Sequence, residues 1–250
     1  MSSLISYLSL DIFGSFESKW RVEFPNAHPV ILGSVITRAG LRLLAKKTAA
    51  DAVEVRADAL LADGATPDEI ETALRKRKQP VLLTLRIPAE GGQRPWKIAE
   101  RRALYLRLLP FVEAIDIELA TAAAMQLVID VARHMDKTVV LSAHAIAKAA
   151  PEKQFARWTA QFEPRPRTIL KIAARIQSWH DLQHLAALLV NHRDWPIAVM
   201  GLGPYAAQSR SVLTALGSRL VYGYLDQPAA PGQPSAAAVR QMVKSVRNLG

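Results

Sequence analysis

The sequence predicts an α/β protein, a single-domain (β/α)₈ TIM barrel, from three observations. Eight short apolar runs, rich in β-branched residues, recur along the 250 residues at similar intervals. The stretches between these runs have helical spacing and helix start signals, as expected where strands and helices alternate. The runs are almost continuously apolar, which indicates strands buried on both faces and is typical of a closed parallel barrel.

The predicted strands follow one another in a regular order. They are VILGSVI from Val30, AVEVRAD from Ala52, VLLTLR from Val81, AIDIEL from Ala114, TVVLSAH from Thr138, TILKIAA from Thr168, IAVMGL from Ile197 and RLVYGYL from Arg219. We therefore assign residues 30–250 to the barrel and residues 1–29 to a short N-terminal extension.

Local signals support the helices and loops between these strands. In TPDEIETALRKRK, Thr66 is a candidate N-cap, Pro67 stands at the first helical position and Glu69 at the third. The segment APGQPS near residue 230 is predicted to be the last loop from a strand to a helix.

Composition narrows the class of protein. Half of the residues are apolar, and 32 Lys and Arg against 22 Asp and Glu give a net charge of +10, which suits an anionic partner. The chain has no cysteine, which excludes disulfides and thiolate metal sites. The N-terminus has no basic leader and its apolar stretch contains Asp11, so we expect no signal peptide, no membrane contact and a cytoplasmic location.

Ionisable residues inside apolar strands carry most of the information about function, because burying an unpaired charge is costly. If the strands close into a barrel, these side chains meet at its C-terminal mouth, where barrel enzymes place their chemistry. The residues are Glu54 and Arg56 in the second strand, Arg86 at the end of the third, Asp116 and Glu118 in the fourth, His144 in the fifth and Lys171 in the sixth.

Two interpretations of this set remain open at the level of residue pattern. The charges can form structural ion pairs, such as Glu54 with Arg86 and Asp116 with Lys171. Alternatively, Lys171 is a nucleophile, because burial near Arg56 and Arg86 disfavours its ammonium form and leaves an amine able to attack a carbonyl. The presence of His144 on the neighbouring strand favours the catalytic interpretation.

Three weaker signals are better explained by structure than by function. The RKRK run at 75–78 fits the cationic end of a helix rather than a nucleic-acid site. His180 and His184 have the spacing of two metal ligands, yet no third ligand is evident nearby. The GLG at 201–203 lacks the remainder of a dinucleotide-binding motif. We therefore expect no nucleic acid, no metal and no organic cofactor.

Taken together in order, these motifs resemble the type I 3-dehydroquinate dehydratases, the Schiff-base enzymes of the shikimate pathway, from about Val30 onward. EVRAD, TLRIPAEGG, IDIE, SAH and KIA resemble five family elements that include Glu54, Arg56, Arg86, Glu90, Asp116, Glu118, His144 and Lys171. VMG, SR, GS and APGQ extend the resemblance through Met200, Ser209 with Arg210, Gly217 with Ser218, and Gln233.

The resemblance implies a lyase that converts 3-dehydroquinate to 3-dehydroshikimate plus water by syn elimination through a Lys171 imine. His144 would be the general acid and base, and Glu90 would orient it. The resemblance also implies substrate contacts from Glu54, Arg56, Arg86, Met200, Arg210 and Gln233, and a homodimer active in aromatic amino acid biosynthesis or in quinate catabolism.

Three departures from the family pattern motivate alternatives. Ala229 stands where a serine is usual, Ala145 stands where an acidic residue is usual, and the loop between Met200 and Arg210 is about two residues longer than is typical. One alternative is a Schiff-base barrel that acts on a related cyclic hydroxy-keto acid. Another is a noncatalytic barrel that binds anions.

Overall fold

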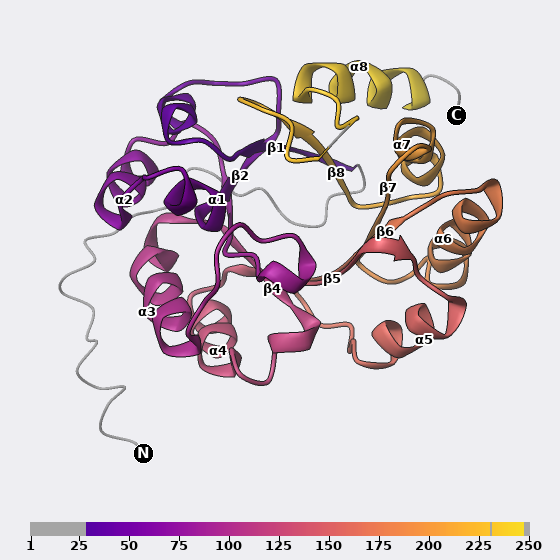
Figure 1. The fold of residues 1–250 in the computed structure, drawn as a ribbon, viewed down its shortest axis with the longest axis horizontal. Coiled ribbons are helices and arrows are strands. Elements are labelled where there is room, and N and C mark those ends of the chain that lie inside the picture. The colour runs from indigo at the N-terminus through magenta and orange to yellow at the C-terminus, as the bar shows by residue number, and fades with distance from the viewer. Residues whose placement is uncertain (1–28, 231, 248–250) are drawn as a thin grey trace.

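The computed structural model describes residues 29–230 and 232–247, and its ribbon shows the predicted barrel, with strands at the centre and helices around them (Figure 1). The strands are β1 (Val30–Val35), β2 (Ala52–Arg56), β3 (Val81–Thr84), β4 (Ala114–Glu118), β5 (Thr138–Ala149), β6 (Thr168–Arg175), β7 (Ile197–Leu202) and β8 (Leu220–Tyr224). Each strand falls on one of the eight predicted apolar runs.

The strands form one parallel sheet that is almost closed. Its order is β7-β6-β5-β4-β3-β2-β1-β8, so β8 joins β1 and brings the two ends of the sheet together. Between β7 and β8 the described residues form no ladder, and the Arg219 N–H instead donates to the Ile197 carbonyl at 3.0 Å. Parallel neighbours throughout place all the C-terminal strand ends on one side of the molecule.

The helices cover the outside of the barrel. They are α1 (Ala57–Ala62), α2 (Pro67–Arg75), α3 (Ile98–Leu108), α4 (Gln126–His134), α5 (Glu152–Ala160), α6 (Trp179–Asn191), α7 (Ala206–Ala215) and α8 (Ala236–Arg247), with 3₁₀ turns η1 (Arg38–Ala45), η2 (Pro88–Glu90), η3 (Leu109–Phe111) and η4 (Leu119–Thr121). In α2 the predicted capping box is present, because Thr66 accepts from the Glu69 N–H while Glu69 accepts from the Thr66 N–H.

Apolar side chains fill two regions that the barrel wall separates. Strand residues such as Leu32, Leu82, Val140 and Ile169 form a cluster inside the barrel. The alternate strand residues pack with the helices in a larger outer cluster. Because the barrel interior is filled with side chains, polar groups of the strands gather at its mouth.

Two strands differ in length from their predicted runs. β3 ends at Thr84 rather than Arg86, because helix α3 binds the next backbone groups: the Leu85 N–H donates to the Tyr105 hydroxyl, and the Leu85 carbonyl accepts from Arg101. β5 continues past His144 to Ala149. The predicted extension, residues 1–29, lies outside the described residues except for Pro29.

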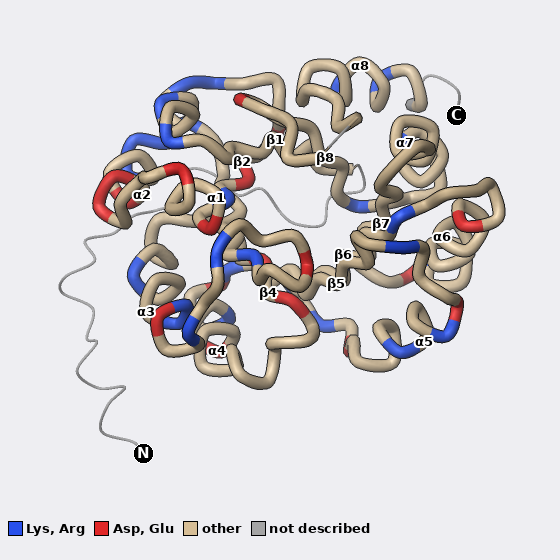
Figure 2. The backbone as a smooth tube through the Cα atoms, viewed as in Figure 1, with Lys and Arg blue, Asp and Glu red and all other residues tan. Residues whose placement is uncertain are grey.

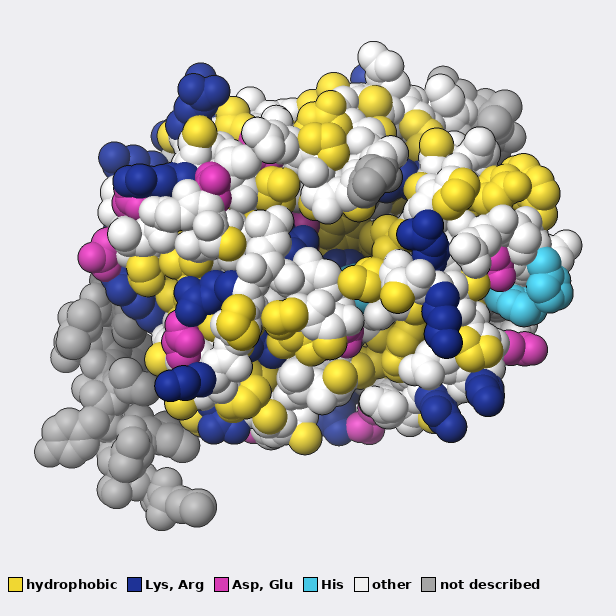
Figure 3. All heavy atoms as spheres, viewed as in Figure 1, with side chains coloured by type: hydrophobic (Ala, Val, Ile, Leu, Met, Phe, Trp, Pro, Cys, Tyr) yellow, Lys and Arg dark blue, Asp and Glu magenta, His cyan; other side chains and the backbone are white. Residues whose placement is uncertain are grey.

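The described helices include none that is both long and apolar enough to cross a membrane. Charged residues gather around the ends of the central strands, where cationic and anionic positions lie next to each other (Figure 2). In the space-filling view, a hollow opens near the middle of this face, with cationic side chains beside it (Figure 3).

Candidate active site

Strand register brings the predicted polar residues to one level of the barrel mouth. Glu118 pairs with Ser142 across β4 and β5, and Ser142 pairs with Lys171 across β5 and β6. Thr84 is the register partner of Asp116. Side chains alternate between the two faces of a strand, so residues two apart on one strand point into the barrel together. The polar residues named above therefore all point into the barrel.

Lys171 lies at the centre of this set and is 3% exposed. Its Nζ atom donates to Asp116 Oδ2 at 2.9 Å. The ring of Tyr222 lies beneath the same nitrogen, with 4.4 Å between Nζ and the ring centroid. The lysine therefore has one anionic partner and one aromatic partner, and both are buried.

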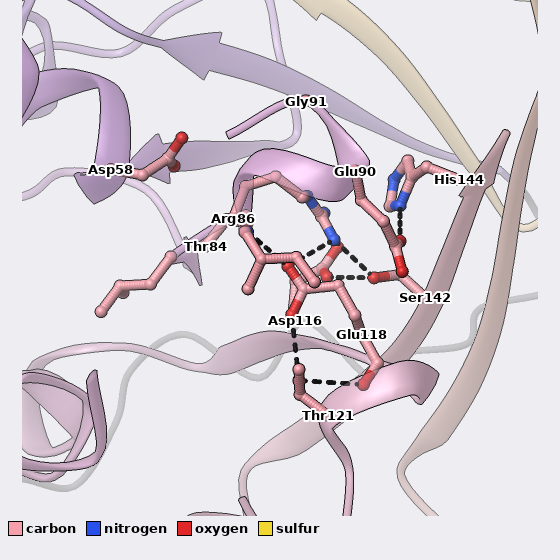
Figure 4. A network of polar contacts seen from close by, with 12 residues as sticks. Asp58, Thr84, Arg86, Glu90, Gly91, Asp116, Glu118, Thr121, Ser142 and His144 are labelled. Atoms are coloured by element: carbon pink, nitrogen blue, oxygen red, sulfur yellow. Dashed lines mark hydrogen bonds and ion pairs between the residues drawn. The ribbon is translucent and has the colours of Figure 1, made fainter. Parts of the chain in front are cut away.

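Arg86 binds the same carboxylate, in the network of Figure 4. Its Nη2 lies 2.9 Å from Asp116 Oδ2, its Nη1 donates to Ser142 Oγ at 2.7 Å, and Nη1 lies 3.3 Å from Glu118 Oε1. Burial by itself lowers the pKa of Arg86, but the charges of Asp116 and Glu118 outweigh burial and raise it. Arg86 is therefore a permanent cation of the site.

Asp116 is shared between these two cations. Ser142 Oγ also donates to Asp116 Oδ1 at 2.5 Å, so both carboxylate oxygens are bound. Burial alone raises the pKa of Asp116, but Arg86 and Lys171 outweigh burial and hold that pKa far below its usual range. Asp116 is thus an anion at every pH at which the fold is expected to work.

His144 lies on β5 against a carboxylate from the loop after β3. Its Nδ1 atom is 2.8 Å from Glu90 Oε2, and Figure 4 shows the two side chains facing each other. Burial, together with the charges of Arg86 and Lys171, lowers the pKa of His144 well below its ordinary value. A neutral imidazole that donates from Nδ1 to Glu90 keeps a lone pair on Nε2, as a general base requires.

The pKa of Glu90 is also shifted from its ordinary value. Burial raises its pKa to about 7, against the opposing effect of Arg86. Glu90 belongs to η2, and Gly91, directly after it, has a positive φ of 92° that turns the loop back over the barrel. The loop is anchored by a hydrogen bond of 3.2 Å from Arg56 Nη2 to the Gly91 carbonyl.

Glu54 and Arg56, two residues apart on β2, have separate partners. Glu54 accepts hydrogen bonds from Ser34 Oγ at 2.6 Å and Thr84 Oγ1 at 3.0 Å, rather than forming the ion pair with Arg86 considered above. Arg56 binds Asp58 through two nitrogens at 2.9 and 2.8 Å. Glu54 thus belongs to the mouth, whereas Arg56 supports the loop that carries Glu90.

The other three predicted contacts come from β7, α7 and the loop after β8. Arg210 is buried on α7, where its Nη1 donates to the Ala206 carbonyl at 3.0 Å, and burial lowers its pKa. It forms no ion pair with another described residue. Met200 packs against the inner cluster. Gln233 Oε1 accepts from the Ala229 N–H at 2.7 Å, which closes the last loop on itself.

The residue pattern did not single out several members of the site. Ser34, Thr84 and Ser142 are hydroxyl residues in the inward phase of their strands. For Thr84 and Ser142, the two-residue spacing from Arg86 and His144 contained this signal. Arg101 gave no such signal, because it lies on α3 and binds Glu118 from outside the barrel wall. Tyr222 gave no such signal either, since an aromatic residue in a strand is typical of a hydrophobic core.

Comparison with known proteins identifies the family. The family model described as type I 3-dehydroquinase matches residues 37–249. The chain belongs to this family. A 3-dehydroquinate dehydratase from Thermodesulfovibrio yellowstonii is 30% identical over 184 residues, which cover 74% of this chain and 80% of the relative. One from Methanocella arvoryzae is 28% identical over 229 residues, covering 92% and 99% of the two chains. The predicted family and enzyme class, a hydro-lyase, are confirmed.

A solved structure supports the fold. The type I 3-dehydroquinate dehydratase from Clostridium difficile, determined with covalently modified comenic acid, superposes with a TM-score of 0.77 at 21% identity and covers 91% of this chain and 96% of the other. At this identity the likeness establishes the barrel alone. Potential metal ligands do not gather in groups of three or more anywhere in the described part of the chain.

Proposed function

We propose that this protein converts 3-dehydroquinate to 3-dehydroshikimate plus water through an imine on Lys171. The observation that carries the proposal is the presence at one barrel mouth of a buried lysine and a largely buried histidine whose pKa is well below its ordinary value. Lys171 and His144 lie on adjacent strands, and each has a carboxylate partner, Asp116 for Lys171 and Glu90 for His144. Membership of the type I family supplies the substrate.

In the first step, His144 Nε2 takes one proton from Lys171, and the neutral Nζ attacks the C3 carbonyl carbon of the substrate. His144 then returns this proton to the hydroxyl of the carbinolamine, which leaves as water and gives a cationic iminium that withdraws electrons from the neighbouring carbon. The permanent anion Asp116 stays beside the nitrogen as its charge returns. Arg86 remains paired to the same carboxylate, so the site changes little in net charge during this step.

In the second step, the Nε2 atom of His144 removes the C2 proton and an enamine forms. The same imidazole then donates that proton to the departing C1 hydroxyl, so one group serves both halves of a syn elimination. Water finally hydrolyses the conjugated iminium, which releases the enone product and restores Lys171. The sum is one substrate giving one product and one water.

Substrate binding follows from the remaining charges. Arg210, which has no carboxylate partner among the described residues, is placed to pair bidentately with the substrate carboxylate. Glu54 and Arg86 hold ring hydroxyls, and Met200 supplies apolar contact. Gln233 is proposed to reach the substrate when the loop after β8 closes, which requires it to release the Ala229 N–H.

The test compares wild type with Lys171→Ala, using the ultraviolet absorbance of the conjugated enone product. We expect the absorbance to rise with wild type and the rate to fall at least ~10³-fold in the variant, because the nucleophile is lost. Lys153→Ala, which removes an exposed lysine on α5, is the matched control and should leave the rate unchanged. Borohydride added with substrate should leave a covalent adduct on wild type and none on Lys171→Ala.

The alternative substrate, a related cyclic hydroxy-keto acid, is favoured by Ala229. Its side chain cannot offer the hydroxyl contact expected of a serine, so the closed loop would hold a different ring pattern. An adduct trapped with such an acid but not with 3-dehydroquinate would decide for it. Absence of any adduct, together with retained anion binding, would leave only the noncatalytic barrel.

The predicted homodimer and cytoplasmic location form part of the same proposal and rest on the family resemblance. Sedimentation of the purified protein measures the first directly. A monomer at every concentration tested would contradict it.

A further inference from the structure

Tyr222 is a buried residue of the site to which the mechanism above gives no role. It lies on β8 at the inner face of the barrel, is 6% exposed and belongs to the inner apolar cluster against which Met200 packs. Lys171 Nζ is 4.4 Å from the centroid of its ring. The aromatic face is therefore in contact with the atom that is proposed to form the imine.

The charge on this nitrogen changes during the proposed reaction. Lys171 Nζ is cationic as an ammonium, neutral as the attacking amine, cationic again as the iminium and neutral in the enamine. A cation over an aromatic face is attracted to the ring quadrupole, and the attraction is strongest where water is excluded. A fixed aromatic face at this position therefore favours the iminium over both of its neutral neighbours.

We propose that the ring of Tyr222 is a catalytic contact that stabilises the iminium on Lys171. The inference deepens the proposed function and rests on it. Asp116 binds the same nitrogen through a hydrogen bond, but its charge is shared with Arg86, so the ring adds a second source of stabilisation without adding charge. The iminium retains one N–H, which lets it face Asp116 and the ring together.

The hydroxyl of Tyr222 is not the working group. It is buried and has no hydrogen-bond partner among the described residues. Burial also raises the pKa of Tyr222 well above its ordinary value, so the phenol stays neutral. Removal of the hydroxyl therefore breaks no hydrogen bond with a described residue, and Tyr222→Phe separates the effect of the ring from that of the hydroxyl.

The experiment measures two quantities on the full-length protein: the rate of borohydride-dependent adduct formation at saturating 3-dehydroquinate, and kcat/KM from enone absorbance. Tyr222→Phe should keep both within about 2-fold, because the ring remains. Tyr222→Leu should lower both by about 10-fold, the scale of one desolvated cation–π contact. Tyr205→Leu, which removes a ring tilted against that of Trp179 on the outside of the barrel, is the control and should change neither quantity.

A second series keeps the test decisive if Tyr222→Leu fails to fold. Residue 222 is replaced by phenylalanine and then by phenylalanines with increasing ring fluorination, which weakens the quadrupole while the shape is kept. Adduct formation should fall stepwise with fluorination. A rate independent of fluorination, or a loss in Tyr222→Phe as large as in Tyr222→Leu, overturns the inference. If wild type forms no adduct, it is the proposed function that fails.

Discussion

Each reactive side chain at the mouth is bound by one acidic residue. Asp116 binds Lys171 and Glu90 binds His144, yet the two carboxylates differ in environment. Asp116 faces two cations, and its pKa is far below the usual range, whereas burial raises that of Glu90 to about 7. One carboxylate is thus a fixed charge, and the other titrates where enzymes operate.

Glu90 should therefore produce the pH dependence near neutrality. As pH rises through about 7, Glu90 ionises, accepts the Nδ1 proton of His144 more strongly and raises the basicity of Nε2, so kcat/KM should rise. His144 cannot cause this step, because its own pKa is lowered well below 6.5. In Glu90→Gln the step should disappear and the plateau should fall about 10-fold or more. A step that persists in the variant would assign it to another group.

Substitution of Arg210 should affect the stability of the fold and the activity in different ways. Its guanidinium is buried, and the described part of the chain gives it no carboxylate partner, an arrangement that costs stability until an anion arrives. Arg210→Met is expected to leave the unfolding midpoint in urea equal or higher, while kcat/KM falls about 100-fold from loss of one charge-assisted contact.

Arg193→Met is the matched control for this prediction, because Arg193 is an exposed arginine before β7, at the opposite end of the barrel. It should change neither the midpoint nor kcat/KM. A destabilised Arg210→Met protein with unchanged kcat/KM would mean that Arg210 is structural and that another group binds the carboxylate.

At the scale of elements, the loop between β3 and α3 positions the general base. It starts beside Arg86, carries Glu90, and folds back so that the Gly92 N–H donates to the Ile87 carbonyl at 2.9 Å. A β-carbon on Gly92 would lie 2.1 Å from the Arg86 carbonyl oxygen. Only glycine allows this close approach of two backbone segments.

Gly92→Ala should therefore displace the loop and separate Glu90 from His144. We expect kcat to fall about 10- to 100-fold, since small misplacements of catalytic groups have effects of this size. Gly64→Ala is the control: Gly64 has a φ of 80° and open space around it, so alanine there strains the backbone without touching the site. The prediction is contradicted if both variants lose stability alike and neither loses activity.

At the scale of the whole molecule, a net charge of +10 should help capture an anionic substrate. Raising ionic strength from ~10 mM to ~0.5 M shortens the screening length several-fold and should lower kcat/KM several-fold, with kcat unchanged. A sucrose series of equal osmolality is the control for nonspecific effects. A kcat/KM that stays constant across the salt series would contradict this prediction. It would mean that only the charged residues in direct contact with the substrate at the mouth assist its binding.

The barrel fold and most of the residues at its mouth could be predicted from the sequence, because both depend on the pattern of apolar and polar residues within short segments. Periodic apolar runs determine which segments become buried strands, and the two-residue strand repeat determines which side chains share a face. Glu54, Arg86, Asp116, Glu118, His144 and Lys171 could therefore be assigned to one end of the barrel. Their order along the chain was also enough to indicate the family.

The residue pattern offered Asp116 with Lys171 as a candidate pair, and the structure contains it. The other partners at the mouth were decided only by the tertiary structure. Asp116 also binds Arg86, and Glu54 binds hydroxyls instead of Arg86, because barrel closure and register set distances between strands that the residue pattern does not contain. Arg101 and Tyr222 reach the site from a helix and from the last strand for the same reason. Sequence alone thus determined the chemical groups available, whereas packing in three dimensions decided most of their partners.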